Sequence, residues 1–320
     1  MKASIISTWL LLLATAAYIQ TIDGAYGDTP LMKAIIANNI DLVTRLLANG
    51  ADAKATNYDG FTALMYAADE GYEKSVELLI PYSDVKATDR YGNTALTRAA
   101  GFGNEESVKL LLPYSNARAK DKNGGFTALL LAARFGKEDS VKLLLPNSNV
   151  KATDDNGFTA LMYAARNWNM EKSVELLIPY SNVKAVDDHF RRTALMFAAE
   201  SGKEKSVELL LPNSNVKATN TDGYTALMWA AQRGNKKILE LLLPNSNLKA
   251  TNNKGYTALM YAVASSTRNW NMEKCVELLL PNSNVKATST DGQSALSLAL
   301  DNGLSSQILG RLRDYYHPGN

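Results

Sequence analysis

The chain has 320 residues, of which 46% are hydrophobic and 21% charged, and its formal net charge is +2. This small net charge argues against a dedicated nucleic-acid-binding protein, for which a strongly basic domain is expected. One cysteine and two histidines exclude an intramolecular disulfide and a Cys/His zinc cluster.

The N-terminal segment, residues 1–17, has the layout of a secretory signal peptide. Lys2 is followed by no charge until Asp23, and "WLLLLATAA" (9–17) is an apolar centre that ends in small residues. We expect cleavage after Ala16 or Ala17, a short linker over 18–23, and a secreted or periplasmic mature protein. The alternative is an uncleaved membrane anchor, because about 20 uncharged residues can span a bilayer. Membrane contact is expected only in that case.

The remaining chain repeats a phrase close to G-x-T-A-L-M-x-A-A. Its Thr or Ser recurs every 32 to 37 residues, at Thr29, Thr62, Thr94, Thr127, Thr159, Thr193, Thr225, Thr257 and Ser294. Each phrase predicts a short helix capped by the hydroxyl of that residue. In the second copy, Gly71 predicts a tight bend, the stripe over 76–79 predicts a second helix, and Pro81 predicts its end.

Nine such units of about 33 residues, each two helices and a polar turn, resemble the ankyrin repeat. The resemblance covers residues 24–312 and leaves a C-terminal tail, 313–320. It implies an all-α repeat solenoid with short β-hairpin-like turns. It also implies a non-enzymatic scaffold that binds another protein on its concave face.

The units depart from the family pattern after the second helix. The usual Gly-Ala survives only at Gly50-Ala51, and elsewhere Pro is followed by Tyr or Asn. Asn tolerates the left-handed conformation that Gly normally supplies, whereas Tyr tolerates it poorly. We therefore expect altered helix ends within an unchanged fold.

Candidate contacts with a partner protein come from the turns. The residue before each capping Thr forms an aromatic-rich row, which either packs along the turns, faces a partner, or does both. Its candidate members are Phe61, Phe126, Phe158, Arg192, Tyr224 and Tyr256. The turn tips add Tyr58, Arg90, Tyr91 and His189.

The bend in "RNWNMEK" lacks the usual Gly and contains Trp168, and a second copy contains Trp270. Duplication of a block of repeats explains the two copies without a paired function. Each Trp is either a buried plug or an exposed contact, and the plug is favoured because Trp usually buries much of its surface.

A basic row follows the turns: Lys54, Lys86, Arg118, Lys151, Lys184, Lys217, Lys249 and Lys286. Asp89, Asp121, Asp154 and Asp187 come three residues after four of these and are expected to offset their charge. We interpret the row as a solvated face, and contact between its C-terminal third and an anionic partner is the alternative.

No residue pattern indicates chemistry. His189 and His317 lack the nucleophile, base and orienting group of a catalytic site, so we expect no enzyme activity, cofactor, metal or small-molecule substrate. A hydrolase grafted on the solenoid is a remote alternative. Cys275 and the Met series (Met32, Met65, Met162, Met196, Met228 and Met260) are interpreted as packing positions, because other units place unrelated residues there.

Overall fold

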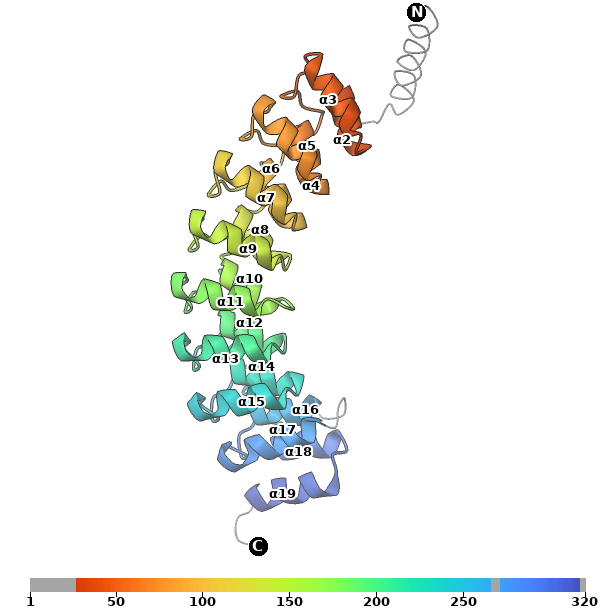
Figure 1. Ribbon diagram of the computed structural model, residues 1–320. Coiled ribbons are helices and arrows are strands. Elements are labelled where there is room, and N and C mark those ends of the chain that lie inside the picture. The colour runs from red at the N-terminus through yellow and green to blue at the C-terminus, as the bar shows by residue number, and fades with distance from the viewer. Residues whose placement is uncertain (1–26, 266–270, 317–320) are drawn as a thin grey trace, which may run out of the picture. The chain divides into compact units, whose positions relative to one another are not determined.

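The computed structural model describes residues 27–265 and 271–316 (Figure 1). The described chain is helical, and its β-pairing is limited to two isolated bridges, between Thr153 and Thr159 and between Thr288 and Ser294. The chain divides into two compact units, unit 1 (Met1–Asn149) and unit 2 (Val150–Asn320). The expected signal peptide or anchor (1–17) and the linker (18–23) lie outside the described residues. Within those ranges no helix is both long and apolar enough to cross a membrane.

Unit 1 is built from pairs of antiparallel helices joined by a tight bend. The first helices are α2 (Pro30–Ile36), α4 (Ala63–Glu70), α6 (Ala95–Phe102) and α8 (Ala128–Arg134). The second helices are α3 (Ile40–Ala48), α5 (Glu73–Leu79), α7 (Glu105–Leu111) and α9 (Glu138–Leu144). First helices pack on first helices and second helices on second helices.

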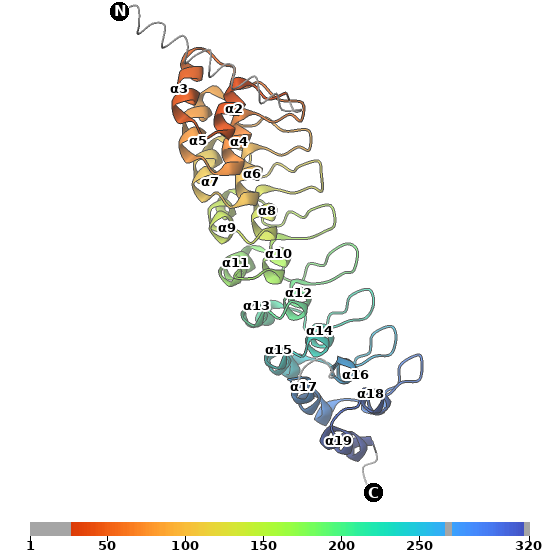
Figure 2. The same ribbon diagram turned by 90° about the vertical axis from the view of Figure 1, so that its right-hand side faces the viewer.

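Unit 2 has the same kind of internal arrangement. Its first helices are α10 (Ala160–Arg166), α12 (Ala194–Glu200), α14 (Ala226–Arg233), α16 (Ala258–Ser265) and α18 (Ala295–Asp301). Its second helices are α11 (Glu171–Leu177), α13 (Glu204–Leu210), α15 (Lys236–Leu242), α17 (Asn271–Leu279) and α19 (Ser306–Tyr316). Within each unit the hairpin loops that precede the first helices project from one side (Figure 2).

The repeated Thr caps the first helix, as predicted. The Thr or Ser oxygen accepts a hydrogen bond from the backbone N–H three residues later at 3.1–3.3 Å, from Thr29 through to Ser294. This bond satisfies one of the N–H groups that a helix start leaves unpaired.

The core lies between successive helix pairs. The six Met side chains of the repeated phrase are at most 1% exposed, and paired alanines such as Ala67 and Ala68 are fully buried. Cys275 is also fully buried, and burial raises the pKa of its thiol to about 11. The packing interpretation of the Met series and of Cys275 is thus confirmed.

The C-termini of the second helices are altered, as expected, but they contain no left-handed Asn or Tyr residue. Each one from α5 to α17 runs into a single 3₁₀ turn that contains the Pro: η1 (Ile80–Tyr82), η2 (Leu112–Tyr114), η3 (Leu145–Asn147), η4 (Ile178–Tyr180), η5 (Leu211–Asn213), η6 (Leu243–Asn245) and η8 (Leu280–Asn282). No Tyr or Asn of these turns has a positive φ. The chain exits through extended Ser residues such as Ser83, so no left-handed residue is needed.

The final helix, α19, buries Ile308 and Leu312 and exposes Gln307 and Arg311, which is the polar outer side that a terminal repeat requires. It continues to Tyr316, beyond the expected boundary at 312.

The bend of "RNWNMEK" contradicts the plug prediction for Trp168. Asn169 takes the left-handed conformation of the missing Gly, with φ 55°, and Met170 fills the buried position. Trp168 is 77% exposed. Its ring covers the ammonium of Lys203, whose Nζ lies 2.7 Å from the ring centroid. Trp270 lies outside the described residues.

Candidate interaction surface

Each hairpin loop is folded around one polar side chain, which is buried in every loop named below except that of the half-buried Asp121. In unit 1, Oδ1 of Asn57 accepts hydrogen bonds from the backbone N–H groups of Asp59 and Phe61 at 3.0 and 2.9 Å. Asp89, Asp121, Asp154, Asp187, Asn220, Asn252 and Ser289 make corresponding bonds. These bonds replace water for loop N–H groups and hold each tip in one conformation.

Backbone hydrogen bonds also tie each tip to the next one in the same unit. In unit 1 the N–H of Arg90 donates to Asp59 at 2.9 Å, and that of Lys122 donates to Tyr91 at 2.7 Å. In unit 2 the same bond recurs from Asp188, Thr221, Asn253 and Thr290 to the preceding tip. The tips of a unit therefore form one supported edge.

This role of the loop carboxylates corrects the expectation that they offset the basic row. Asp89 and Asp187 are at most 1% exposed and pair with Arg98 and Arg192. Asp154, at 3% exposed, accepts a hydrogen bond from the Tyr163 hydroxyl at 2.6 Å. The spacing to the lysines reflects loop folding and not charge compensation.

The aromatic row packs along the turns of each unit, which is one of the two roles expected for it. In unit 2, Phe158 lies 5.1 Å from Phe197 between ring centroids, and Tyr224 lies 5.1 Å from Tyr261. The Tyr256 ring lies 5.4 Å from Tyr261, and its hydroxyl lies 2.7 Å from Gln293 Oε1. Such offset ring contacts add to apolar burial and stiffen the unit.

The partners of this row form a second row that the sequence analysis missed. They occupy the variable position of T-A-L-M-x-A-A, four residues after the capping Thr: Tyr66, Arg98, Leu131, Tyr163, Phe197, Trp229, Tyr261 and Leu298. A residue that varies within an otherwise constant helical phrase was the available signal. The ring of Phe61 lies 5.1 Å from Tyr66, which shows the same pairing in unit 1.

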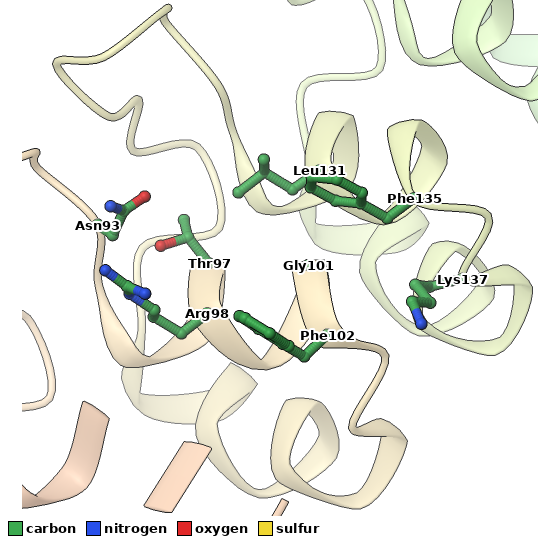
Figure 3. Close-up of a pocket in the computed structure, with 8 residues that line it drawn as sticks. All are labelled: Asn93, Thr97, Arg98, Gly101, Phe102, Leu131, Phe135 and Lys137. Carbon is green, nitrogen blue, oxygen red and sulfur yellow. The ribbon is translucent and has the colours of Figure 1, made fainter. Parts of the chain in front are cut away.

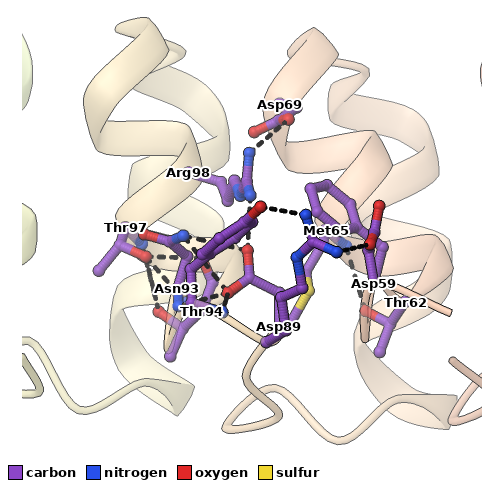
Figure 4. Close-up of polar contacts among 12 residues, drawn as sticks. Asp59, Thr62, Met65, Asp69, Asp89, Asn93, Thr94, Thr97 and Arg98 are labelled. Atoms are coloured by element: carbon purple, nitrogen blue, oxygen red, sulfur yellow. Dashed lines mark hydrogen bonds and ion pairs between the residues drawn. The ribbon is translucent and has the colours of Figure 1, made fainter. Parts of the chain in front are cut away.

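In unit 1 the second row contains an arginine that joins two repeats (Figure 4). The Arg98 guanidinium contacts Asp89 and lies 3.2 Å from Asp69, and it lies 4.2 Å above the Phe61 ring centroid. Burial acts to raise the pKa of Asp89, but hydrogen bonds from Arg98 and Asn93 outweigh it and lower that pKa. Asp89 is thus the ionised partner of Arg98.

Arg192 makes the corresponding cluster in unit 2. It lies 3.3 Å from Asp187, 3.4 Å from Glu200 and 4.3 Å above the Phe197 ring centroid. Arg233 lies 3.6 Å from the same Glu200. Arg192 is therefore held in place, with part of its surface left to solvent.

The other predicted contact residues differ in exposure. Tyr58 is 82% exposed and Tyr91 37% exposed, and Arg90 lies on the surface and contacts Tyr91 and Asp59. His189 is exposed, and its Nε2 lies 2.7 Å from Asn156 Oδ1. Phe61, Phe158, Tyr224 and Tyr256 are half-buried.

Phe126 is the exception among these candidates. It is only 7% exposed and lies beneath the guanidinium of Arg134, 4.6 Å from the ring centroid. The extra glycine, Gly124-Gly125, lengthens this loop and lets the ring fold inward. Phe126 is therefore a packing residue and not a contact.

Neutralising Asp69 is expected to stabilise unit 1 at neutral pH. Burial raises the pKa of Asp69 to about 6, and Arg98 only partly opposes this; Oδ1 is buried without a hydrogen-bond partner. The folded-state pKa lies above the unfolded value of about 3.9, so the favourable contribution is complete below pH ~4 and is lost as pH rises through ~6. Asp69→Asn should gain about 1 kcal/mol at pH 7.5, and this advantage should vanish at pH 4.

Urea unfolding at the two pH values measures this difference. Asp84→Asn is the matched control, because Asp84 is exposed and Asn116 and Asn182 occupy its position in other repeats. It should change stability little at either pH. A loss of stability in Asp69→Asn that is equal at pH 4 and pH 7.5 would contradict the assignment.

The described ranges hold no group of three or more His, Cys, Asp or Glu side chains that could bind a metal ion. The surface consists instead of supported loop tips, half-buried rings and two anchored arginines.

Comparison with known proteins gives the same repeat. A family model of ankyrin repeats matches residues 6–89, 81–154, 131–220 and 195–288. The ankyrin repeat domain of human ASB11 superposes with a TM-score of 0.62 at 21% identity, covering 70% of this chain and all of that domain. This likeness shows the shared fold.

Curated relatives match shorter stretches. Mitochondrial disaggregase of Bos taurus is 36% identical over 75 residues, which is 23% of this chain and 11% of that protein. Notch-regulated ankyrin repeat-containing protein B of Danio rerio is 40% identical over 57 residues, which is 18% of this chain and 51% of that protein. The chain thus spans about half or less of these relatives. Because the family model covers most of the sequence, the chain belongs to the ankyrin-repeat proteins.

Proposed function

We propose that this chain is an exported, non-enzymatic scaffold of nine ankyrin units that binds another protein on its concave face, formed by hairpin tips and first helices. Ankyrin repeats are protein–protein interaction modules, which supports the class of function. The observation that carries the proposal is large, exposed aromatic surface on supported backbone: Tyr58 is 82% and Trp168 77% exposed. Exposed aromatics and arginines are the side chains that dominate binding energy in protein interfaces.

The support beneath these side chains favours binding over accidental exposure. Tyr58 follows Asn57, whose buried side chain is also fixed by its neighbours. Its Nδ2 donates hydrogen bonds to Asp28 Oδ1 at 2.8 Å and to the Tyr66 hydroxyl at 3.1 Å. A tip fixed before binding loses less conformational entropy when a partner docks. The proposed contacts are therefore the tip residues Tyr58, Arg90, Tyr91 and His189, with Arg192, Tyr224 and Tyr256 beside them and Trp168 in the bend after α10.

Site-specific photo-crosslinking tests this surface. A benzophenone amino acid at Tyr58 or Trp168 should capture a protein from extract or culture medium of the source organism. The matched controls are Tyr82 and Tyr180, which are 56% and 59% exposed but lie in the 3₁₀ turns after second helices. Equal capture from all four positions, or capture only from the control positions, would overturn the proposed surface.

The sequence at the N-terminus of the mature protein distinguishes an exported chain from a membrane-tethered one. If the chain is exported as proposed, N-terminal sequencing of the fractionated protein should begin after Ala16 or Ala17. An intact Met1 in a membrane fraction would replace this proposal with a membrane-tethered ankyrin scaffold.

A further inference from the structure

Unit 1 contains a pocket of about 410 Å³ between α6 and α8 (Figure 3). Its lining includes Arg98, Gly101 and Phe102 from α6, Leu131 from α8, and Phe135 and Lys137 from the bend that follows. The volume is at the lower end of the range for ligand pockets, which suits one or two side chains of a peptide.

The walls of the pocket are apolar at positions that are polar elsewhere. Phe102 and Phe135 precede the bend glycines Gly103 and Gly136, and they are 58% and 55% exposed. The residues before the other bend glycines are Glu70, Ser201, Arg233 and Asn302. Two neighbouring exposed rings at a normally polar position leave apolar area in water that packing of the chain itself does not use.

The floor of the pocket is a glycine that the fold does not require. Gly101 lies inside α6, where Gly is less favourable than Ala by about 0.5–1 kcal/mol. A Cβ built there would meet nothing closer than 3.8 Å, from the side chain of Phe135. Steric pressure within the protein therefore does not explain Gly101, whereas an open pocket floor does.

The charge of the lining is positive at one end. Its residues include two cations and no carboxylate. Arg98 is neutralised by Asp69 and Asp89, but Lys137 lies within ion-pair distance of no carboxylate in the described part of the chain. The carboxylates Glu138 and Asp139 follow it on α9 and are not part of the lining. An anionic group entering beside the rings would meet Lys137.

We infer that this pocket receives an aromatic side chain of a partner protein segment in which the next residue is Asp or Glu. The ring fills the space between Phe102 and Phe135 above Gly101, and the carboxylate pairs with Lys137. The inference rests on the proposed protein-binding function and names the partner chemistry at one point of that surface.

The probe is N-acetyl-Phe-Glu amide, titrated into the full chain with 4-fluorophenylalanine at its seven Phe positions. The ¹⁹F signals of Phe102 and Phe135, assigned with Phe102→Leu and Phe135→Leu, should shift together and saturate. N-acetyl-Phe-Lys amide should bind at least about threefold more weakly, and N-acetyl-Ala-Glu amide should leave both signals in place. Failure of the Phe102 and Phe135 signals to move with the Phe-Glu probe would overturn the inference.

Gly101→Leu fills the pocket without changing either ring. It should abolish the shifts while keeping the thermal unfolding midpoint at or above that of the parent chain, because Leu favours the helix. Gly310→Leu is the matched control on α19, where a Cβ meets nothing within 4 Å, and it should leave binding intact. Lys137→Glu should reverse the preference toward the Phe-Lys probe. Binding that survives in Gly101→Leu would place the probe elsewhere and remove the pocket from the surface.

The pocket and the proposed scaffold function can be contradicted independently. Crosslinking of a partner to position Tyr58 with equal yield in the parent chain and in Gly101→Leu would support the scaffold function. This result would also show that the pocket does not contribute to it. Saturable binding of the Phe-Glu probe without any crosslinked partner would support the proposed pocket and contradict the proposed tip surface.

Discussion

Phe197→Ala is expected to destabilise unit 2 by about 3–5 kcal/mol, the range for truncating a fully buried Phe. Phe197 is 0% exposed on α12, and it packs on Phe158 and beneath the Arg192 guanidinium. Truncation would leave a cavity and would also remove the ring on which Arg192 rests. Urea unfolding followed by circular dichroism measures the loss, and hydrogen exchange should locate it in α10 to α13.

Phe190→Ala is the matched control in the same repeat. Phe190 is 49% exposed, and its backbone contacts with Asp187 and Thr221 do not depend on the ring. It should cost no more than about 0.5 kcal/mol, as is usual for surface substitutions. Equal destabilisation by the two variants would contradict the assignment of Phe197 as the packing centre of the aromatic rows.

The repeat period predicted the fold because most copies carry the same helix signals. The capping Thr, the buried Met and the paired Ala recur in register, so each local preference agrees with the global arrangement. Variation among copies also carried information. Cys275 aligned with Ser and Ile residues, which indicated packing, and the structure buries it fully.

The irregular bend could not be predicted in the same way. The bend "RNWNM" (166–170) has one residue more than a Gly bend such as 69–72, and the sequence does not determine which of its side chains points inward. Asn169 adopts φ 55°, and this one dihedral directs Met170 into the core and Trp168 into solvent. The general tendency of Trp to be buried was a weaker determinant than the backbone of the bend.

The sequence predicted the tip residues of the candidate surface but not the partners of the loop carboxylates. The tip residues were found because they vary, but the loop carboxylates were interpreted by their spacing to the lysines. Their actual partners are loop N–H groups together with a different side chain in each repeat: Arg98 for Asp89, the Tyr163 hydroxyl for Asp154 and Arg192 for Asp187. The loop N–H bonds recur at a separation of four residues in most copies, but the side-chain partners lie five or nine residues away and differ in type, so the spacing to the lysines alone misassigns the carboxylates.

Asp187→Ala is expected to cost about 3 kcal/mol, at the lower end of the range for breaking a buried ion pair. The Asp187 carboxylate is 0% exposed, accepts from the Phe190 N–H at 2.6 Å and lies 3.3 Å from Arg192 Nε. Removing it leaves the loop N–H groups without their side-chain acceptor and leaves the Arg192 guanidinium with Glu200 alone. Arg191 in this loop has φ 54°, an unfavourable conformation for a residue other than glycine, so the loop depends on the bonds to Asp187 in addition to its backbone hydrogen bonds.

Asp187→Asn separates the two roles of the carboxylate. Asn57, Asn220 and Asn252 cap the corresponding loops, so an amide should keep the loop folded and lose only the charge on Arg192. Its expected cost is about 1 kcal/mol, and the exposed neighbour Asp188→Ala should stay within about 0.5 kcal/mol. Urea unfolding ranks the three variants, and hydrogen exchange at the Phe190 amide should accelerate only in Asp187→Ala. If Asp187→Asn proved as damaging as Asp187→Ala, the ion pair with Arg192 and not the loop cap would be the main contribution of this residue.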